Sequence, residues 1–301
     1  MALVGYFFGT GPTGFGYNST AEEVTSGVDL QGKTYLITGC NSGLGQETLR
    51  VLSLRGASIV AIARSVDKAT ASLAGRKGIP VACDLSEPAS VRHAVQSIQS
   101  LPPIHGIIAN AGIMALPKRQ QKHNLELQFL TNHVGHFLLV TGLLHRLTPD
   151  GRVVMLSSRA HNRTYPEGLR LDDLGAERGY SPWEAYGQSK LSNLLFASEL
   201  ATRLPEGQTA NSLHPGVIST NLARHMGSMV SAALSIANPL VLKSIPQGAA
   251  TQCYAAVHPS MTGISGEYLA DSNLSTPSKF GQDPQLARAL WKKTEELVAE
   301  L

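Results

Sequence analysis

A tyrosine and a lysine four residues apart, Tyr186 and Lys190, are the side chains of this sequence best suited to proton transfer. Residues 183–204 have a helical pattern, and residues four apart on a helix lie on one face, one turn apart. An ammonium at that distance favours the phenolate, so we expect the pKa of Tyr186 to fall below its ordinary value of about 10. Such a phenol can exchange a proton near neutral pH. The alternative is a chance pairing on a helix surface, since the chain has eight tyrosines.

A glycine-rich turn lies near the start of the chain, between an expected strand at 35–38 and an expected helix at 44–54. Its sequence is Thr38-Gly39-Cys40-Asn41-Ser42-Gly43-Leu44-Gly45, with glycines spaced G-x-x-x-G-x-G. Glycines here let the backbone approach a pyrophosphate, and the helix N-terminus supplies N–H donors. The turn therefore indicates a nucleotide site, and the alternative is a glycine turn without a ligand.

The residues after the second expected strand, 58–63, indicate which dinucleotide binds. An acidic residue there would hydrogen-bond the ribose 2′-hydroxyl of NAD. The sequence instead has Arg64-Ser65, and an arginine offers a charge and a fork that suit a 2′-phosphate. We therefore expect NADP(H) as the cofactor, with a ligand-free surface arginine as the alternative.

Apolar segments of strand length alternate with amphipathic helical segments along the chain. The strands are expected at 35–38, 58–63, 81–83, 104–109, 153–156, 211–213 and 267–269. The helices are expected at 44–54, 86–98 with Ser86 as N-cap, 125–147, 183–204 and after Asp283-Pro284. This alternation predicts an α/β protein: one doubly wound, Rossmann-type domain with a parallel sheet of about seven strands and helices on both faces. Ligands of such sheets bind beyond the carboxyl ends of the strands, where Asp84-Leu85 and Asn110-Ala111-Gly112 fall.

We expect residues 29–301 to form a single dinucleotide-binding and catalytic domain, with residues 1–28 as an amino-terminal arm packed on it. The formal net charge is +3 and no long run of Lys and Arg occurs, which argues against a nucleic-acid partner. Three cysteines without CxxC spacing indicate a reducing compartment and no thiolate metal site. No apolar run approaches the roughly 20 residues of a membrane span. Neither a signal peptide nor a transit peptide is expected, so the cytoplasm is the expected location.

In order along the chain, these motifs resemble those of the short-chain dehydrogenase/reductase family. The resemblance runs from Lys33 to about Asp271 and rests on 38–45, Asp84-Leu85, Asn110-Ala111-Gly112, Asn132, Ser158, Tyr186-x-x-x-Lys190, and Pro215-Gly216 with Thr220. Three longer segments, at 127–137, 157–161 and 185–193, are similar to the branch of retinol dehydrogenases and plastid inner-envelope translocon-associated short-chain dehydrogenases.

The resemblance implies a role for each matching residue. Tyr186 would be the general acid/base, and Lys190 would bind the nicotinamide ribose and lower the pKa of the tyrosine. Ser158 would hydrogen-bond the substrate oxygen, and Asn132 would hold a water that connects Lys190 to solvent. Donors from Ser158 and Tyr186 would stabilise the alkoxide charge that develops during hydride transfer.

The cofactor-binding set implied by the motifs runs from the glycine turn to the end of the sixth strand. Within it, Asp84 and Asn110 would line the adenosine side, and Pro215, Gly216 and Thr220 the nicotinamide end. The full set is Gly39, Asn41, Ser42, Gly43, Leu44, Gly45, Arg64, Ser65, Asp84, Leu85, Asn110, Ala111, Gly112, Tyr186, Lys190, Pro215, Gly216, Val217 and Thr220.

The spacing between Ser158 and Tyr186, 28 positions, is longer than in many members of the family. We interpret the polar segment 161–182 as a surface insertion typical of the retinol dehydrogenase-like branch. Ser157 competes for the serine role, and Ser158 is favoured because family members commonly use the second serine of such a pair.

Three further features have open alternatives. His133 and His136, three apart on an expected helix, are interpreted as packing or hydrogen-bonding residues rather than metal ligands, and no metal site is expected. His214 either lines the site or only packs beside it.

The apolar stretch 226–242 falls where the family carries a substrate lid, expected at about 221–245. An apolar lid implies a bulky hydrophobic carbonyl or alcohol, while ordinary core or a subunit or membrane contact are the alternatives.

Two functions are expected, the first from these residues and the second from the resemblance to the plastid-type relatives. The first is an NADP(H)-dependent oxidoreductase that interconverts a hydrophobic ketone or aldehyde and its alcohol. The second is an NADP(H)-binding, redox-sensing interaction protein with little turnover. A scaffold has no physical need for an acid/base group, so the complete set of Asn132, Ser158, Tyr186 and Lys190 favours the enzyme. The resemblance also implies a possible homodimer, formed through the helices after Ser181 and Asn221.

Overall fold

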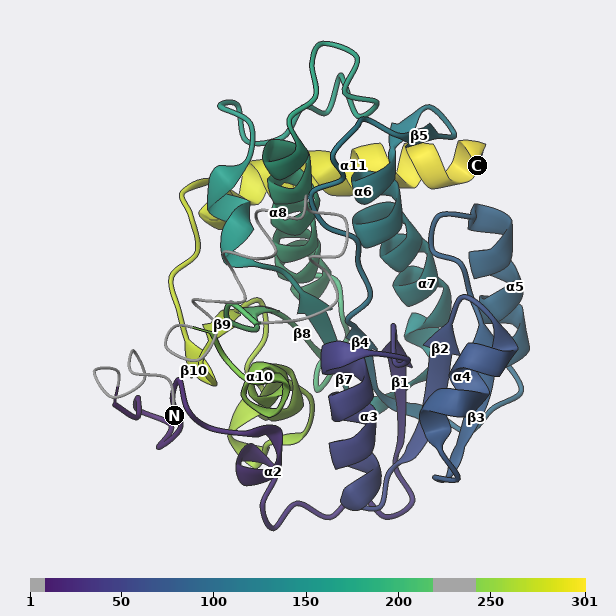
Figure 1. The fold of residues 1–301 in the computed structure, drawn as a ribbon, viewed down its shortest axis with the longest axis vertical. Coiled ribbons are helices and arrows are strands. Elements are labelled where there is room, and N and C mark those ends of the chain that lie inside the picture. Colours follow the sequence, from purple (N-terminus) through teal and green to yellow (C-terminus); the bar gives the residue numbers. More distant parts are fainter. Residues whose placement is uncertain (1–8, 219–241) are drawn as a thin grey trace.

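The computed structural model describes residues 9–218 and 242–301, which form an α/β structure around one large sheet (Figure 1). Eight strands lie in the order β10-β9-β8-β7-β4-β1-β2-β3. All neighbours pair in parallel except β9 and β10. The strands are β1 (Thr34–Thr38), β2 (Ser58–Ala63), β3 (Gly78–Ala82), β4 (Ile104–Ala109), β7 (Leu147–Leu156), β8 (Thr209–His214), β9 (Tyr268–Ala270) and β10 (Asn273–Leu274).

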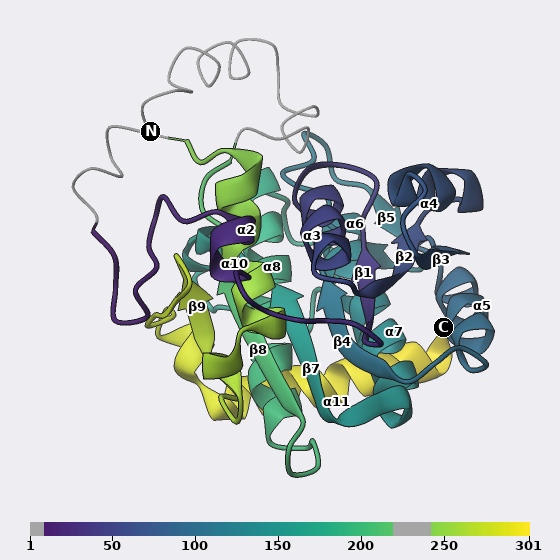
Figure 2. The ribbon, with the colours of Figure 1, turned by 90° about the horizontal axis from the view of Figure 1, so that it is seen from below.

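Helices cover both faces of the sheet, as Figure 2 shows, which confirms the doubly wound fold. Successive side chains of a strand point to opposite faces, so Tyr35 and Ile37 of β1 join one core and Leu36 joins the other. The first core includes α2 (Ala21–Val24), α3 (Gly43–Leu54), α4 (Val66–Leu73) and α10 (Ile245–Val257). The second face carries α5 (Pro88–Ile98), α7 (Gly135–Leu143), α8 (Pro182–Ala201) and α11 (Pro284–Glu300).

The expected fold class is confirmed, and the described sheet has eight strands against the expected number of about seven, because β10 adds a short antiparallel edge. It has only two residues, which is too short for a periodic apolar pattern to reveal. The centre of the sheet matters more for function: β1 lies between β4 and β2, so the chain order reverses there. Ligands of open α/β sheets bind in the crevice at such a switch point.

The single helix expected at 125–147 is wrong in detail. Leu125–Glu126 form β6, which pairs with β5 (Gln121–Lys122). The helix then runs as α6 (Leu127–Phe129), a π-helical turn at Leu130–Val134, α7, and a 3₁₀ turn at Leu144–Arg146, after which β7 begins. The buried Glu126 carboxylate accepts hydrogen bonds from the backbone N–H groups of Gln128 and Phe129, which fixes the helix start. π-Helical turns occur frequently at functional sites, and this one contains Asn132.

The expected cap of the helix at 86–98 is also wrong, whereas the cap of the last helix is confirmed. α5 begins at Pro88, and Ser86 instead donates hydrogen bonds through its backbone N–H and hydroxyl to the Asp84 carboxylate. At the other end of the chain, Asp283 accepts from the backbone N–H groups of Gln285 and Leu286 at the start of α11.

The segment 161–182 is not only a surface insertion. The segment packs on α8, and four of its apolar side chains are buried: Tyr165, Leu169, Leu174 and Ala176. The close approach occurs at Gly187, where an added Cβ would lie 2.6 Å from the carbonyl oxygen of Arg163 and 2.7 Å from that of Ala160. Because Gly187 has no side chain, the insertion can pack closely against the helix that carries Tyr186.

The described part of the amino-terminal arm, residues 9–28, contacts α10 and Asn273 of β10. α2 begins with a capping box between Thr20 and Glu23 and packs on α10 and α3. The Phe15 ring lies edge-on to Tyr254, with centroids 5.8 Å apart. The expected lid at 221–245 and the expected cofactor residue Thr220 fall largely or wholly outside the described residues.

We expect Gly187→Ala to lower the free energy of unfolding by about 1–3 kcal/mol, because the added methyl group would meet two fixed backbone carbonyls. The same change inside a helix ordinarily stabilises by roughly 0.5–1 kcal/mol. Urea denaturation measures the difference. Gly9→Ala is the control, since no atom lies within 4 Å of its added Cβ. A Gly187→Ala protein as stable as the wild type would contradict the close packing.

Candidate active site

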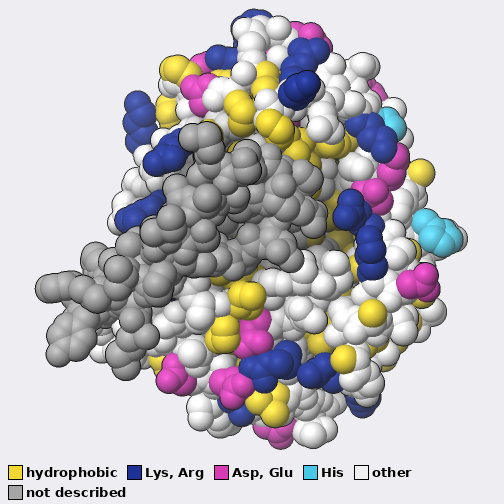
Figure 3. Space-filling view, in the orientation of Figure 1, with side chains coloured by type: hydrophobic (Ala, Val, Ile, Leu, Met, Phe, Trp, Pro, Cys, Tyr) yellow, Lys and Arg dark blue, Asp and Glu magenta, His cyan; other side chains and the backbone are white. Residues whose placement is uncertain are grey.

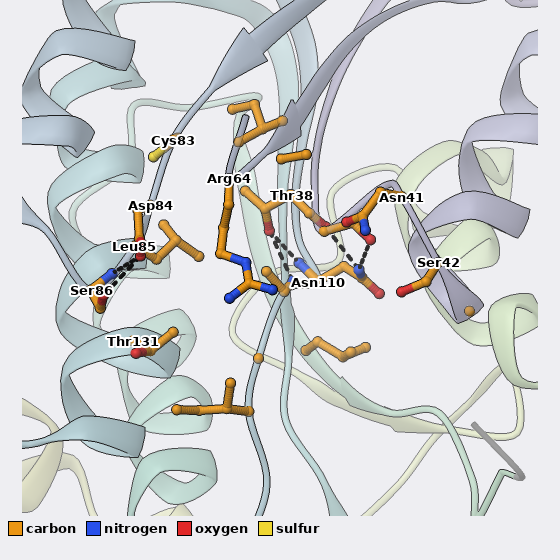
Figure 4. A pocket seen from close by; sticks show the side chains of 18 of the residues that line it. Thr38, Asn41, Ser42, Arg64, Cys83, Asp84, Leu85, Ser86, Asn110 and Thr131 are labelled. Carbon is orange, nitrogen blue, oxygen red and sulfur yellow. Dashed lines mark hydrogen bonds between the residues drawn. The ribbon is translucent and has the colours of Figure 1, made fainter. Parts of the chain in front are cut away.

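A cavity of about 270 Å³ lies beyond the carboxyl ends of β1 to β4, at the switch point of the sheet (Figure 4). Eleven of the expected cofactor residues line it: Gly39, Asn41, Ser42, Gly43, Leu44, Arg64, Asp84, Leu85, Asn110, Ala111 and Gly112. The other described residues of the expected set do not line it: Gly45, Ser65, Tyr186, Lys190, Pro215, Gly216 and Val217. The sequence reasoning missed ten other residues of the wall, which adjoin the expected ones at strand ends or come from the following helices: Thr38, Ile62, Ala63, Cys83, Ser86, Ile113, Met114, Leu127, Thr131 and Leu156.

The glycines of the turn have two distinct uses. Gly39 and Gly43 have φ of +68° and +54°, a left-handed conformation that glycine adopts at no steric cost. Gly45 lies under the turn, because an added Cβ would be 2.3 Å from the carbonyl oxygen of Gly39. The Ser42 side chain makes no capping hydrogen bond to α3, so the first-turn amides have no side-chain acceptor. This arrangement suits an anion at the helix start.

Thr38 connects the glycine turn to the end of β4. Its hydroxyl oxygen accepts hydrogen bonds from the backbone N–H groups of Asn110, at 3.0 Å, and Ala111, at 2.9 Å. The Asn110 amide donates back to the Thr38 carbonyl at 2.8 Å, as the dashed lines of Figure 4 show. The two strand ends that form the floor of the cavity are therefore held in register by side chains as well as by the sheet.

A buried histidine extends this connection to the π-helical turn. Both lone pairs of the Thr38 hydroxyl are used, so its proton goes to Nε2 of His136, 2.9 Å away. His136 then carries its proton on Nδ1 and donates it to the Asn132 carbonyl at 2.8 Å. Burial lowers the pKa of His136 to about 4, which keeps the ring neutral as this tautomer requires. His133 likewise hydrogen-bonds the Thr294 hydroxyl at 3.0 Å.

Asn132 clamps the segment that follows β4. Its side-chain oxygen accepts from the backbone N–H of Ile113 at 2.8 Å. Its amide donates to the Ile113 carbonyl and the Ser189 hydroxyl, both at 2.9 Å. Both amide protons are thus used within the protein. The expected role of Asn132 in holding a water stays a prediction.

Lys190 is a buried lysine without a carboxylate partner among the described residues. The side chain is 3 % exposed, and its ammonium donates to the Leu156 carbonyl at 2.8 Å. The Asn193 amide donates to the same carbonyl at 3.1 Å. An added Cβ on Gly112, in the cavity wall, would lie 3.5 Å from Nζ. Burial lowers the pKa of Lys190 to about 7, and the remaining donors of the ammonium are available to a ligand.

The expected fall in the pKa of Tyr186 is wrong for this structure, because burial raises the pKa to about 12. A hydrogen bond with Ser158 lowers the pKa only in part. The lysine nitrogen lies 5.8 Å from the centroid of the phenol ring, and Lys190 itself loses charge near neutral pH. The cost of burying a phenolate therefore exceeds the attraction of the neighbouring cation, and Tyr186 is neutral at pH 7.

The two candidate serines face different neighbours. Ser157 is buried, and its hydroxyl donates to the Lys190 carbonyl at 2.7 Å. Ser158 is half-buried, and its hydroxyl interacts with Tyr186 while it accepts from the Ala160 N–H at 3.1 Å. The structure therefore brings Ser158, and not Ser157, to the phenol.

The loop after β8 lies beside this group. His214, the last residue of β8, is half-buried and accepts a hydrogen bond at Nδ1 from the Arg159 N–H, one residue after Ser158. Pro215, Gly216 and Val217 follow, with φ of +94° at Gly216. Val217 is 54 % exposed.

Arg64 lies at the end of β2 and borders the cavity. Its side chain is exposed and extends over the cavity between Leu85 and Asn110 in the view of Figure 4. It makes no ion pair within the described part of the chain. Asp84, the acidic residue of the cavity wall, has one carboxylate oxygen bonded to Ser86.

The sequence profile of the short chain dehydrogenases matches residues 33–169. Short-chain dehydrogenase TIC 32 B, chloroplastic, from Brassica napus is 42 % identical over 320 aligned positions, which cover 100 % of both chains. Human retinol dehydrogenase 13 is 34 % identical over 91 % of this chain and 86 % of its own. The crystal structure of an uncharacterized protein from Mycobacterium paratuberculosis is similar with a TM-score of 0.74 and 34 % identity, covering 92 % of this chain and 97 % of that one.

We expect Lys190→Met to stabilise the protein by an amount that falls as pH rises. The pKa of this lysine is about 7 when folded and near its ordinary 10.5 when unfolded, so the unfolded chain binds more protons between these values. Below pH 7 the wild type bears the full cost of a buried cation, on the order of a few kcal/mol at most. Denaturation of both proteins across the pH range measures the difference.

The control for this experiment is Lys292→Met, which removes an exposed lysine of α11. Its stability relative to the wild type should not change with pH in the same range. A Lys190→Met protein whose gain stayed constant between pH 7 and pH 10.5 would show that the lysine has an ordinary pKa.

Proposed function

The chain belongs to the short-chain dehydrogenase family of oxidoreductases, and we propose that it interconverts a hydrophobic ketone or aldehyde and its alcohol with NADP(H). Membership confirms the resemblance inferred from the motifs, including its branch. The observation that carries the proposal is the grouping of Tyr186, Ser158 and Lys190 beside the cavity at the carboxyl ends of the strands. Buried titratable groups with shifted pKa values beside a cleft are typical of active sites.

The cavity residues fit a dinucleotide. The first turn of α3 and the glycines of the turn would hold the pyrophosphate. Arg64, without an ion-pair partner in the described residues, would pair with a 2′-phosphate. The spare donors of Lys190 would bind ribose hydroxyls. When bound, the reduced cofactor supplies the hydride that the substrate carbonyl carbon accepts.

Two residues of the chain then stabilise and neutralise the negative charge on the substrate oxygen. Ser158 and Tyr186 donate hydrogen bonds to that oxygen as it gains negative charge, and Tyr186 transfers its proton to it. A neutral phenol is the form required for carbonyl reduction, and the pKa of about 12 keeps Tyr186 in that form. In alcohol oxidation, the Lys190 cation would favour the phenolate that accepts the proton.

Exposed apolar side chains beside Tyr186 support a hydrophobic substrate. Trp183 lies one turn before Tyr186 on α8, 37 % exposed, with its ring edge-on to the phenol at 6.3 Å. Val217, on the loop that follows His214, is also exposed. A small polar carbonyl compound would leave both surfaces in water, whereas an apolar one would cover them.

Several expectations about partners stay predictions. The described helices include none long and apolar enough to cross a membrane. On the face seen in Figure 3, Lys and Arg side chains are dispersed among acidic and uncharged ones. The absence of a nucleic-acid partner stays an expectation from the sequence. A homodimer through α8 would use a helix on which α11 already packs (Figure 1). Cytoplasmic location remains an expectation from the sequence.

A panel of ketones and aldehydes with NADPH tests the reaction. We expect turnover of bulky apolar members, and we expect Tyr186→Phe to lower kcat by about 10²–10⁴-fold with little change in NADPH binding, because only the proton donor is lost. The control Tyr254→Phe alters a buried tyrosine of α10 that stacks on His258, away from the cavity, and should keep full activity. Tight NADPH binding without turnover of any compound would instead favour the redox-sensing interaction protein.

Cofactor choice is tested separately by Arg64→Asp. Removing a charge-assisted contact to the 2′-phosphate, worth about 1.5–3 kcal/mol, should lower kcat/KM with NADPH by roughly tenfold to a hundredfold. The value with NADH should stay level or rise. Arg288→Asp makes the same charge reversal on exposed α11 and should leave both values unchanged. Equal NADPH and NADH constants in the wild type would refute the assignment.

A further inference from the structure

Lys243, just before α10, is a second buried lysine that the proposed reaction does not use. Its side chain is 1 % exposed, and its ammonium pairs with the Asp271 carboxylate at 2.5 Å. The nitrogen also lies 4.8 Å from the centroid of the Tyr17 ring in the amino-terminal arm. Burying a lysine is costly even when it is paired, so the ion pair is weak evidence for a purely stabilising role.

Both the backbone and the side chain of Lys243 contact the loop after β8. Its backbone N–H donates to the Val217 carbonyl at 2.9 Å, and residue 243 forms a parallel bridge with Ile218. Its methylene stem packs on Gly216, where an added Cβ would lie 2.6 Å from Cδ and 3.0 Å from Cε. Gly216 therefore has to be a glycine for two reasons, its positive φ and the lysine stem that covers it.

The carboxylate partner is itself fixed. Asp271 and Ser272 form the turn between β9 and β10, with φ of +52° and +61°. The Ser272 N–H donates to the Thr251 hydroxyl of α10, and the Asn273 amide donates to the Asp271 carbonyl. Asn273 also receives hydrogen bonds from Thr13 of the arm. These hydrogen bonds fix the turn that carries the Asp271 carboxylate.

The loop held by this ion pair borders the site. It follows His214, whose ring accepts from the backbone N–H of Arg159, next to Ser158, so the loop starts beside the proposed site of hydride transfer. The cavity wall at the ends of β1 to β4 contains none of Pro215, Gly216 and Val217. The ion pair therefore acts on one end of the site and not on the other.

We propose that Lys243 and Asp271 form a positioning pair, which fixes the loop Pro215–Val217 as the wall for the nicotinamide half of the cofactor. This inference rests on the proposed function. It predicts that loss of the pair weakens binding of the whole dinucleotide but not of its adenosine half, because the adenosine half would lie in the separate cavity.

The test measures dissociation constants of NADPH and of 2′,5′-ADP, which lacks the nicotinamide half, for the full chain. Lys243→Met keeps the apolar stem and removes the positive charge. Asp271→Asn removes the negative charge of the ion pair, on a side chain that is half-exposed. Each should raise the Kd of NADPH about tenfold and leave that of 2′,5′-ADP within about twofold. The double variant should be no weaker than the weaker single variant, since both changes break one interaction.

Lys279→Met is the matched control. It removes an exposed lysine whose nitrogen lies 4.8 Å from the Phe280 ring centroid, and it should alter neither constant. Unchanged NADPH binding in both single variants, or equal weakening of both ligands, would overturn the positioning role. A wild-type protein that binds no NADPH would overturn the proposed function instead, so the two failures are distinguishable.

Discussion

A lysine ammonium buried without a neighbouring carboxylate is the constraint on which the rest of the site depends. Lys190 has one carbonyl partner in the described residues, Leu156, and its pKa is lowered by burial alone. Such a group reduces stability unless another molecule completes its hydrogen bonds. The surrounding structure is consistent with that use: Gly112 has no side chain to block the approach, and Asn193 holds the shared carbonyl in place. The site thus contains a buried ammonium whose hydrogen-bond donors are only partly satisfied by the described residues.

The elements around this lysine are fixed by polar contacts between segments far apart in the chain. Thr38 and His136 connect the glycine turn to the π-helical turn, where Asn132 holds the segment after β4. Gly187 lets the insertion pack against the helix of Tyr186. In a protein that tolerates a destabilising cation at its centre, these contacts keep the strand ends at fixed separations, which orientation of a hydride donor and acceptor requires.

Sequence reasoning succeeded where the signal is local. The strand, glycine turn and helix at 34–54, the cap at Asp283, and the shared helix of Tyr186 and Lys190 follow from periodicity and turn chemistry within a few residues. Sequence reasoning failed where burial by segments distant in the chain determines a residue's pKa or exposure. The pKa of Tyr186 rises because the whole fold desolvates it, and the insertion at 161–182 is buried through isolated apolar residues without a regular period. Lys243 could not be found, since its partners lie in the arm and at residue 271.

The most direct test of the account is the titration of the Lys190 amine by ¹⁵Nζ NMR, with and without NADPH. We predict a pKa of about 7 in the free protein. NADPH should raise that pKa, because hydrogen bonds to ribose hydroxyls favour the charged form. A pKa near the ordinary 10.5 in the free protein, or one that NADPH leaves unchanged, would contradict the central claim.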